Sequence, residues 1–128
     1  MKIESGIDIV EIARIEEALK NPRFLQKTLT ETEREYVKKK TGRLGDSEVF
    51  PVATVAGLFA AKEAVSKAIG VGLLKGIGFF DIEIDHTPLG APFVRLSAKA
   101  RKIAGEGEFS VSIAHDGGFA IAVANRVF

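Results

Sequence analysis

The chain has 128 residues, no cysteine and a net charge of +1 at pH 7. This near-neutral charge gives no general attraction to nucleic acid or to an anionic membrane, and the lack of cysteine excludes disulfides and thiolate chemistry. The first residues lack the basic and apolar regions of a signal peptide, and no stretch approaches about 20 uninterrupted apolar residues. We therefore expect one domain over 1–128, located in the cytoplasm, that binds neither nucleic acid nor membrane.

The first half of the chain is predicted to hold one strand and several short helices. Residues 2–10 form a β-branched run that is apolar on both faces, which predicts a buried strand with Asp8 inside it. Helices are expected at 11–19, from residue 23 after Asn21-Pro22, and at 31–40, where Thr30 to Glu33 has the form of a capping box. Glycine, charge and proline in 42–51 predict an exposed loop.

The second half is predicted to begin with a long helix and to end in strands. The helix spans 52–69, ends at Gly70, and is followed by a glycine-rich connection. Strands are expected at 79–84, 92–96, 109–115 and 119–124, with a short helix at 98–104. Helices grouped early and strands grouped late predict an α+β domain, in which a mainly antiparallel sheet packs on one long helix with further short helices.

Polar residues on the long helix are the first functional signal. Four of them fall within an arc of about 140° at 100° per residue; they are Lys62, Glu63, Ser66 and Lys67. A solvated face would explain them, with Glu63 and Lys67 forming an i, i+4 pair worth about 0.3–0.5 kcal/mol. Phe59 lies on the same stripe, however, and a solvated face rarely carries a large aromatic side chain.

Two further residues are unusual for their positions. Asp8 lies between Ile7 and Ile9 in a strand predicted to be buried, so its carboxylate needs a cation. That cation is either a Lys or Arg side chain or a Mg²⁺ ion shared with Glu63. His115 lies on the apolar face of its strand, at the mouth of the last hairpin, where it is either hydrogen-bonded at the edge of the core or in contact with a phosphate.

Four segments together resemble the holo-[acyl-carrier-protein] synthases, the short type of 4′-phosphopantetheinyl transferase. They are GIDIVE at 6–11, FAAKEA with SKA at 59–68, DIEI at 81–84 and SIAH at 112–115. The resemblance covers essentially the whole chain. It implies transfer of 4′-phosphopantetheine from coenzyme A to a serine of apo acyl carrier protein, with release of adenosine 3′,5′-bisphosphate, in fatty acid biosynthesis. It also implies a homotrimer with active sites between neighbouring chains.

The resemblance further assigns roles to individual residues. Asp8 and Glu63 would hold Mg²⁺ against the coenzyme A pyrophosphate, and they form the catalytic set with Lys67, which contacts the pyrophosphate. The coenzyme A contacts would come from Lys62, Ser66, Lys67 and His115, with His115 at the nucleotide end. Either Glu63 or a metal-bound water would accept the serine proton.

The acyl carrier protein of this family is acidic, so docking would need basic residues. The resemblance places docking on the first two helices, which carry Arg14, Arg23 and Lys27. The alternative is that these side chains are ordinary solvated charges.

The chain departs from the family at two positions. Leu58 stands where an arginine is common, and Ala114 stands where serine or threonine often precedes the histidine. We expect both changes to remove coenzyme A contacts but no metal ligand, and we hypothesise that Lys39, Lys40 or Arg43 replaces them.

Two alternative functions fit the same residues. The first is a Mg²⁺-dependent hydrolase of nucleotides or of coenzyme A, because two acids and a lysine suit attack by water equally well. The second is a non-catalytic oligomeric binding module, in which Asp8 and Glu63 are structural ion-pair partners. Alanines at 120, 122 and 124 would leave one strand face smooth enough for a helix or a second subunit in either case.

Overall fold

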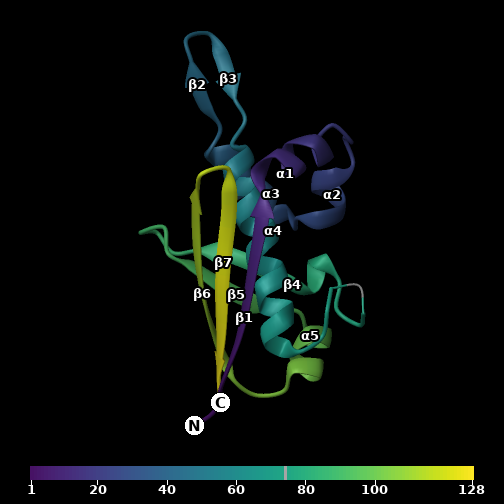
Figure 1. The fold of residues 1–128 in the computed structure, drawn as a ribbon. Coiled ribbons are helices and arrows are strands. Elements are labelled where there is room, and N and C mark those ends of the chain that lie inside the picture. Colours follow the sequence, from purple (N-terminus) through teal and green to yellow (C-terminus); the bar gives the residue numbers. More distant parts are fainter. Residues whose placement is uncertain (74) are drawn as a thin grey trace.

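The computed structural model describes residues 1–73 and 75–128 and confirms the predicted α+β class (Figure 1). In chain order the elements are β1 (Ile3–Glu11), α1 (Ile12–Ala18), α2 (Phe24–Thr28), α3 (Glu31–Lys39), β2 (Gly42–Leu44), β3 (Ser47–Val49), α4 (Val52–Ile69), a 3₁₀ turn (Phe79–Asp81), β4 (Ile82–His86), β5 (Pro92–Leu96), α5 (Ala98–Ala104), β6 (Glu108–Asp116) and β7 (Phe119–Val127).

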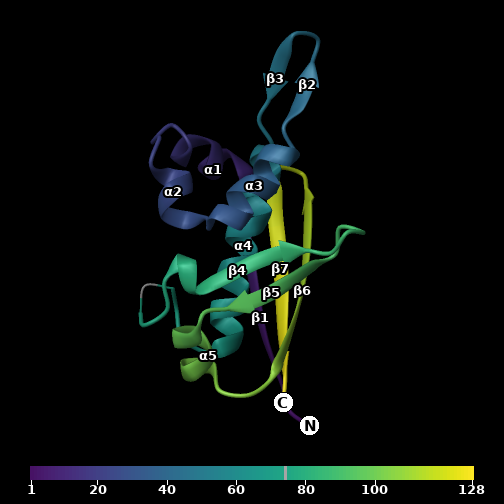
Figure 2. The same ribbon diagram turned by 180° about the vertical axis from the view of Figure 1, so that it is seen from behind.

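Helix α4 lies at the centre of the molecule. On one side it packs against an antiparallel sheet with strand order β1-β7-β6, and the separate β4–β5 ribbon crosses on its other side (Figure 2). The predicted smooth face of β7 meets this helix, because Ala120, Ala122 and Ala124 are all fully buried. The helix ends at Gly70, whose φ of 92° is a left-handed conformation that glycine adopts without strain.

Strand β1 approaches α4 unusually closely at Gly6. A Cβ atom at this position would overlap the Ala64 carbonyl oxygen and lie 2.7 Å from the amide nitrogen of Ala68. Only a residue without a side chain fits such a contact between backbones. This contact fixes the next inward-facing residue of β1, Asp8, over the second half of the helix.

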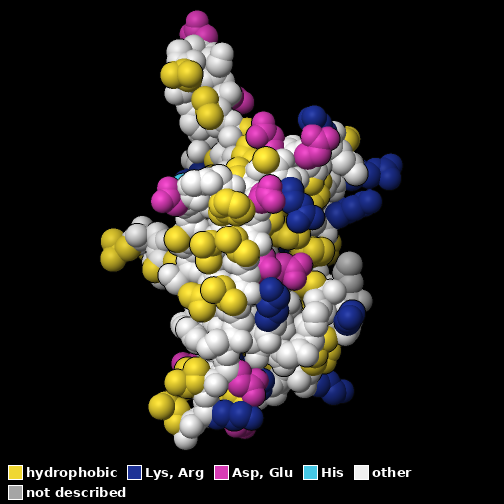
Figure 3. Space-filling model, viewed as in Figure 1, with side chains coloured by type: hydrophobic (Ala, Val, Ile, Leu, Met, Phe, Trp, Pro, Cys, Tyr) yellow, Lys and Arg dark blue, Asp and Glu magenta, His cyan; other side chains and the backbone are white. Residues whose placement is uncertain are grey.

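The prediction that β1 is buried on both faces is wrong. Gly6 and Val10 face inward, whereas Ile7 and Ile9 are 63% and 59% exposed on the outer face of the sheet. Figure 3 shows that hydrophobic side chains gather on this outer face, over β1 and β7. Both faces of β1 are apolar, but only one of them lies in the core, and the other lies on the surface of the single chain.

The segment predicted as a loop at 42–51 is also different in the structure. Strands β2 and β3 pair as a short antiparallel hairpin that projects beyond the end of α4 (Figure 1). All six of their residues are exposed. The strand predicted at 79–84 begins three residues later, because Phe79–Asp81 forms the 3₁₀ turn.

Candidate active site

Asp8 and Glu63 line one cleft between β1, α4 and the first two helices. This cleft has a volume of ≈ 280 Å³, and Arg14, Phe24 and Phe59 also line it. Phe59 stacks on Phe24 with ring centroids 6.3 Å apart, which gives the cleft an apolar wall. The structure therefore brings together the two carboxylates that are 55 residues apart in the sequence, as the metal-site hypothesis requires.

Lys67, one turn after Glu63 on α4, also contacts Asp8. Its Nζ donates hydrogen bonds to Asp8 Oδ1 at 3.1 Å and to the Ile7 carbonyl oxygen at 2.9 Å. Asp8 and Lys67 also share a surface groove with Ile7, Ile9 and Ile121. Lys67 is thus a direct hydrogen-bond and ion-pair partner of Asp8.

The electrostatic environment of Glu63 disfavours its charged form. Burial raises the pKa of the Glu63 carboxyl group, the nearby Asp8 charge raises this pKa further, and Lys67 opposes both effects. A carboxylate responds in this way when a second carboxylate is close and no cation lies between them. The two acids therefore lie close enough for the charge of Asp8 to disfavour the charge of Glu63.

These residues fit a Mg²⁺ ion. Mg²⁺ prefers hard oxygen ligands, and a site that binds phosphates typically supplies only one or two carboxylates and leaves the other positions to water and phosphate oxygens. Within residues 1–73 and 75–128, no group of three or more acidic, histidine or cysteine side chains is placed so that it could hold a metal ion by itself. Two neighbouring carboxylates with an excess of negative charge therefore match a metal that substrate oxygens help to hold.

The four polar residues of the long helix, which fall on one arc, differ in their surroundings, and two of them are buried. Lys62 is completely buried and donates to Glu33 Oε1 at 2.5 Å. Burial lowers the pKa of Lys62, and the charge of Glu33 opposes this shift. Ser66 is also fully buried, and its hydroxyl donates to the Glu63 carbonyl oxygen. Neither side chain lines the cleft, so the structure gives no support to the expected contacts of Lys62 and Ser66 with coenzyme A, which stay a prediction.

Glu33 is the partner that the sequence did not reveal. Its side chain accepts from the backbone N–H groups of Thr30, which completes the predicted capping box, and of Ile84 on β4. Together with Lys62 these bonds join α3, α4 and β4. The capping pattern identified Glu33 as a helix cap, but nothing in the spacing of 29 residues indicated the ion pair.

His115 lies in a different pocket from the two acids. This pocket lies between α4, β5 and β6 and is lined, among others, by Gly57, Leu58, Pro92 and His115. It shares no lining residue with the Asp8 and Glu63 cleft. One chain therefore does not bring His115 next to the acids, although the resemblance places all three in one active site.

An aromatic pair that the sequence did not indicate lies beside the His115 pocket. The rings of Tyr36 and His86 stack with centroids 3.6 Å apart, and both also line a second pocket that contains Lys39 and Lys40. Burial lowers the pKa of His86, as does Lys40, against the opposing charge of Asp85. These residues come from α3 and from the end of β4, so only the tertiary fold brings them together.

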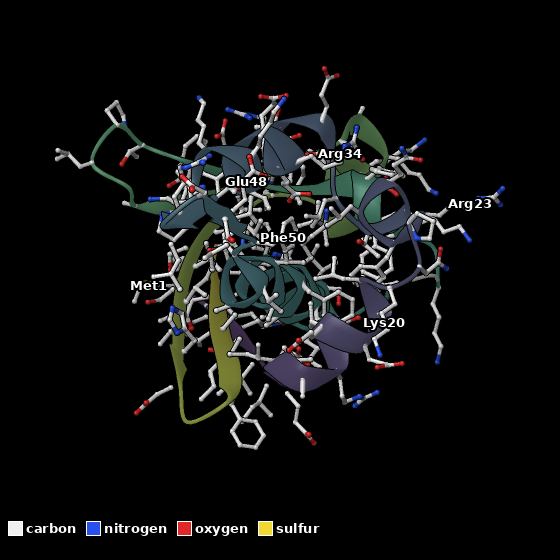
Figure 4. The ribbon with its side chains drawn as sticks, turned by 90° about the horizontal axis from the view of Figure 1, so that it is seen from above. Met1, Lys20, Arg23, Arg34, Glu48 and Phe50 are labelled. Atoms are coloured by element: carbon white, nitrogen blue, oxygen red, sulfur yellow. The ribbon has the colours of Figure 1, made fainter. Side chains whose placement is uncertain are left out.

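The basic residues assigned to docking are exposed on the first two helices. Arg14, Arg23 and Lys27 are all on the surface, and Arg14 also lines the acidic cleft. Figure 3 shows Lys and Arg side chains over α1 and α2, and in Figure 4 the Lys20 and Arg23 side chains extend outward from this edge. The basic surface thus lies next to the two carboxylates.

The fold and this pair of acids define a class. Residues 4–124 match the model of the 4′-phosphopantetheinyl transferase superfamily, so the chain belongs to this family. Among the residues described, no helix is both long enough and apolar enough to cross a membrane.

Similar proteins give a more specific comparison. The chain is 42% identical to the holo-[acyl-carrier-protein] synthase of Caldanaerobacter subterraneus, with 99% of this chain and 96% of that protein covered. It is 43% identical to the corresponding synthase of Campylobacter lari, over 92% and 93% of the two chains. The crystal structure of the Helicobacter pylori synthase in complex with coenzyme A matches with a TM-score of 0.82 and 40% identity, over 96% of this chain and 99% of that one.

Proposed function

We propose that the chain is a holo-[acyl-carrier-protein] synthase, which transfers 4′-phosphopantetheine from coenzyme A to a serine of apo acyl carrier protein. The observation that carries the proposal is the convergence of Asp8 and Glu63 in one cleft, with Lys67 on Asp8. The similar synthases, which are alike over nearly their whole length, support the same activity. The released product is adenosine 3′,5′-bisphosphate.

The reaction exchanges one P–O bond for another. The serine oxygen attacks the phosphorus that carries the pantetheine arm, and the bridging P–O bond breaks with its electron pair leaving on the bisphosphate. Asp8 and Glu63 would hold Mg²⁺, which when bound neutralises charge on the pyrophosphate oxygens. Lys67 supplies a further positive charge to these oxygens. Either Glu63 or a water molecule held in the cleft would accept the serine proton.

The nucleotide end of coenzyme A is proposed to lie in the pocket of His115. Leu58 lines this pocket as a buried apolar side chain, in the place of the arginine common in the family. Lys39 and Lys40 line the adjoining pocket, which shares Tyr36, His86 and Gly90 with the first. They are the better replacements for the missing cation, since Arg43 lies on the projecting hairpin and donates to the Asp46 carbonyl oxygen. An unchanged KM for coenzyme A after substitution of Lys39 and Lys40 would contradict this assignment.

The carrier is proposed to dock on the basic surface of α1 and α2, formed by Arg14, Arg23 and Lys27. An acidic partner would meet complementary charge there, and its serine would be delivered toward the cleft that Arg14 also lines. We further propose that the chain is a single domain that works in the cytoplasm in fatty acid biosynthesis.

A homotrimer with active sites between chains is also proposed. Two features support it: the exposed apolar outer face of β1 and β7 directly beside Asp8 and Lys67, and the separation of His115 from the acids within one chain. A neighbouring copy packed on this face would cover the isoleucines and would supply its own His115 pocket to the cleft.

Mass spectrometry tests the activity directly. The protein is incubated with coenzyme A, Mg²⁺ and apo acyl carrier protein, and the carrier mass and the small-molecule products are recorded. A transferase gives a heavier carrier and one bisphosphate for each carrier modified. Release of free phosphopantetheine with unmodified carrier would instead identify a hydrolase, and the absence of any product would leave only the binding-module alternative.

A further inference from the structure

We infer that Lys67 is an exchangeable counterion of Asp8, which a divalent cation must displace before the site can work. In the metal-free protein the Lys67 ammonium group neutralises Asp8; when the cation binds, Lys67 is released and becomes available to a phosphate oxygen of coenzyme A. This inference rests on the proposed function, because it concerns the same metal and pyrophosphate site.

The contacts of Lys67 are those of a cation held by hard oxygen atoms. Its Nζ lies 2.9 Å from the Ile7 carbonyl oxygen and 3.1 Å from Asp8 Oδ1, and both oxygens belong to the edge strand β1. A carboxylate and a backbone carbonyl are also the oxygen types that bind divalent cations. The ammonium group therefore already uses the negative charge that the metal requires.

Exchange of Lys67 for a metal ion requires that Asp8 stays in place while Lys67 can move, and the exposure of the two side chains fits this requirement. The Asp8 side chain is only 17% exposed, whereas that of Lys67 is 50% exposed. Asp8 thus depends on a nearby cation, while Lys67 can move its charge into water or toward a ligand on its flexible four-carbon chain. Asp8 also lines both the groove that holds Lys67 and the cleft that holds Glu63, so a new cation can approach from the Glu63 side.

The local charges imply cooperation between metal and coenzyme A. Asp8, Glu63 and Lys67 sum to one negative charge when all three are ionised, and Arg14, which also lines the cleft, makes no ion pair with either acid in the described part of the chain. A divalent cation makes the sum positive and frees Lys67 for an anion. Conversely, an anion that draws Lys67 away leaves Asp8 free for the metal. Since coupling between two ligands is reciprocal, each should strengthen the binding of the other through Lys67.

Direct metal binding tests the exchange without any turnover. Free Mn²⁺ is measured by electron paramagnetic resonance during titration of metal-free protein, for the wild type, Lys67→Met and Lys67→Arg. We expect Lys67→Met to bind Mn²⁺ roughly two- to fivefold more tightly, the range that a partly exposed ion pair is worth. Lys67→Arg keeps a competing cation and should bind as the wild type does. Lys99→Met removes a surface ammonium group beside another acid, Asp81, and should leave Mn²⁺ affinity unchanged.

A second titration, with coenzyme A present but no carrier, measures the coupling. The factor by which coenzyme A tightens Mn²⁺ binding should be smaller in Lys67→Met than in the wild type. A Lys67→Met protein that binds Mn²⁺ no more tightly than the wild type would overturn the inference, as would an equal gain in Lys99→Met. Asp8→Asn distinguishes a failure of the Lys67 exchange from a failure of the proposed function. If this variant binds Mn²⁺ as well as the wild type does, the metal site of the proposed function is itself wrong.

Discussion

Glu63 lies where burial and a neighbouring carboxylate both disfavour its charged form. A carboxylate in such surroundings costs stability when it is charged, and residues of this kind are frequent at functional sites. Because its pKa is raised in the folded state, the contribution of Glu63 to stability is fully present below its ordinary pKa and is lost as the pH rises through the raised value. The metal-free protein therefore carries an electrostatic cost at neutral and alkaline pH.

Glu63→Gln should remove that cost together with the function. In metal-free buffer at about pH 8 we expect Tm to rise by on the order of 1–3 °C, with the difference from the wild type disappearing toward about pH 4. Carrier modification should be lost in the same variant. Thermal unfolding at both pH values measures the first effect, and Glu48→Gln on the exposed hairpin serves as the control without either change. A lower Tm for Glu63→Gln at alkaline pH would contradict the account.

The neighbouring residue, Lys62, stabilises the fold through a buried ion pair. It is fully buried on Glu33, and each charge is tolerated in the core only because of the other. We expect Lys62→Met to cost about 3–5 kcal/mol in the free energy of unfolding, since it leaves a buried carboxylate uncompensated. The double variant Lys62→Met with Glu33→Gln should recover part of this loss. Urea denaturation of the three proteins measures the effect, and a double variant less stable than Lys62→Met would show that Glu33 does not depend on Lys62.

At the scale of elements, the site depends on how closely β1 lies against α4. Gly6→Ala would place a methyl group 2.7 Å from the Ala68 amide nitrogen and 2.9 Å from the Lys67 Cβ, so the strand must move away from the helix. We expect a loss of stability of at least about 1–3 kcal/mol, the usual cost of overpacking, and weakened Mn²⁺ binding in the protein that still folds. Gly42→Ala is the matched control, because nothing lies within 4 Å of its added Cβ. Equal behaviour of the two variants in urea denaturation would rule out the proposed tight contact.

Helices α1 and α2 carry the basic surface proposed to receive the carrier. Arg14→Glu should raise the KM for apo acyl carrier protein roughly three- to tenfold and reduce the salt dependence of association, because one attractive charge becomes repulsive. The KM for coenzyme A should change little. Lys99→Glu on α5 makes the same charge reversal away from this surface and should leave both constants unchanged. Steady-state kinetics at two salt concentrations decides the matter, and an equal effect of the two reversals would remove the docking assignment.

The sequence predicted correctly those features of the fold that a few adjacent residues determine. The capping box at Thr30, the end of α4 at Gly70 and the last hairpin at Asp116-Gly117-Gly118 were all predicted correctly, because each is decided by a few adjacent residues. The hairpin at 42–49 was missed, since two glycines and mixed charges give no alternation.

Predictions that needed the tertiary fold were less successful. Lys62 and Glu63 are adjacent in the sequence and fall on one arc, yet one faces Glu33 in the core and the other faces the cleft. Similarly, the apolar residues Ile7 and Ile9 gave no sign that their face of β1 lies outside the core of the chain. The convergence of Asp8 and Glu63 was one of two hypotheses from the sequence, because a carboxylate in a strand predicted to be buried needs a cation and Glu63 lies on a polar arc of the long helix that could share one.

At the scale of the whole molecule, the described chain holds two groups of predicted site residues apart. Asp8, Glu63 and Lys67 lie on the β1 side of α4, whereas His115 lies in a pocket with no residue in common with their cleft. An exposed apolar face adjoins the acids, and hydrophobic surface of this kind is typical of subunit contacts. In the proposed symmetric trimer the cleft of one chain would meet the His115 pocket of the next.

Mixed trimers test whether the site is shared between chains. Asp8→Ala and His115→Ala are each expected to impair carrier modification, His115→Ala mainly at low coenzyme A. When the two variants are unfolded together and refolded, random assembly of a closed trimer should restore roughly a quarter of the sites, those pairing an intact acid cleft with an intact histidine pocket. A mixture of Asp8→Ala with Glu63→Ala should restore none, because both changes lie in the same cleft of one chain. If the Asp8→Ala and His115→Ala mixture stays at the level of its components while its measured mass is that of a trimer, His115 and the acids do not belong to one shared site.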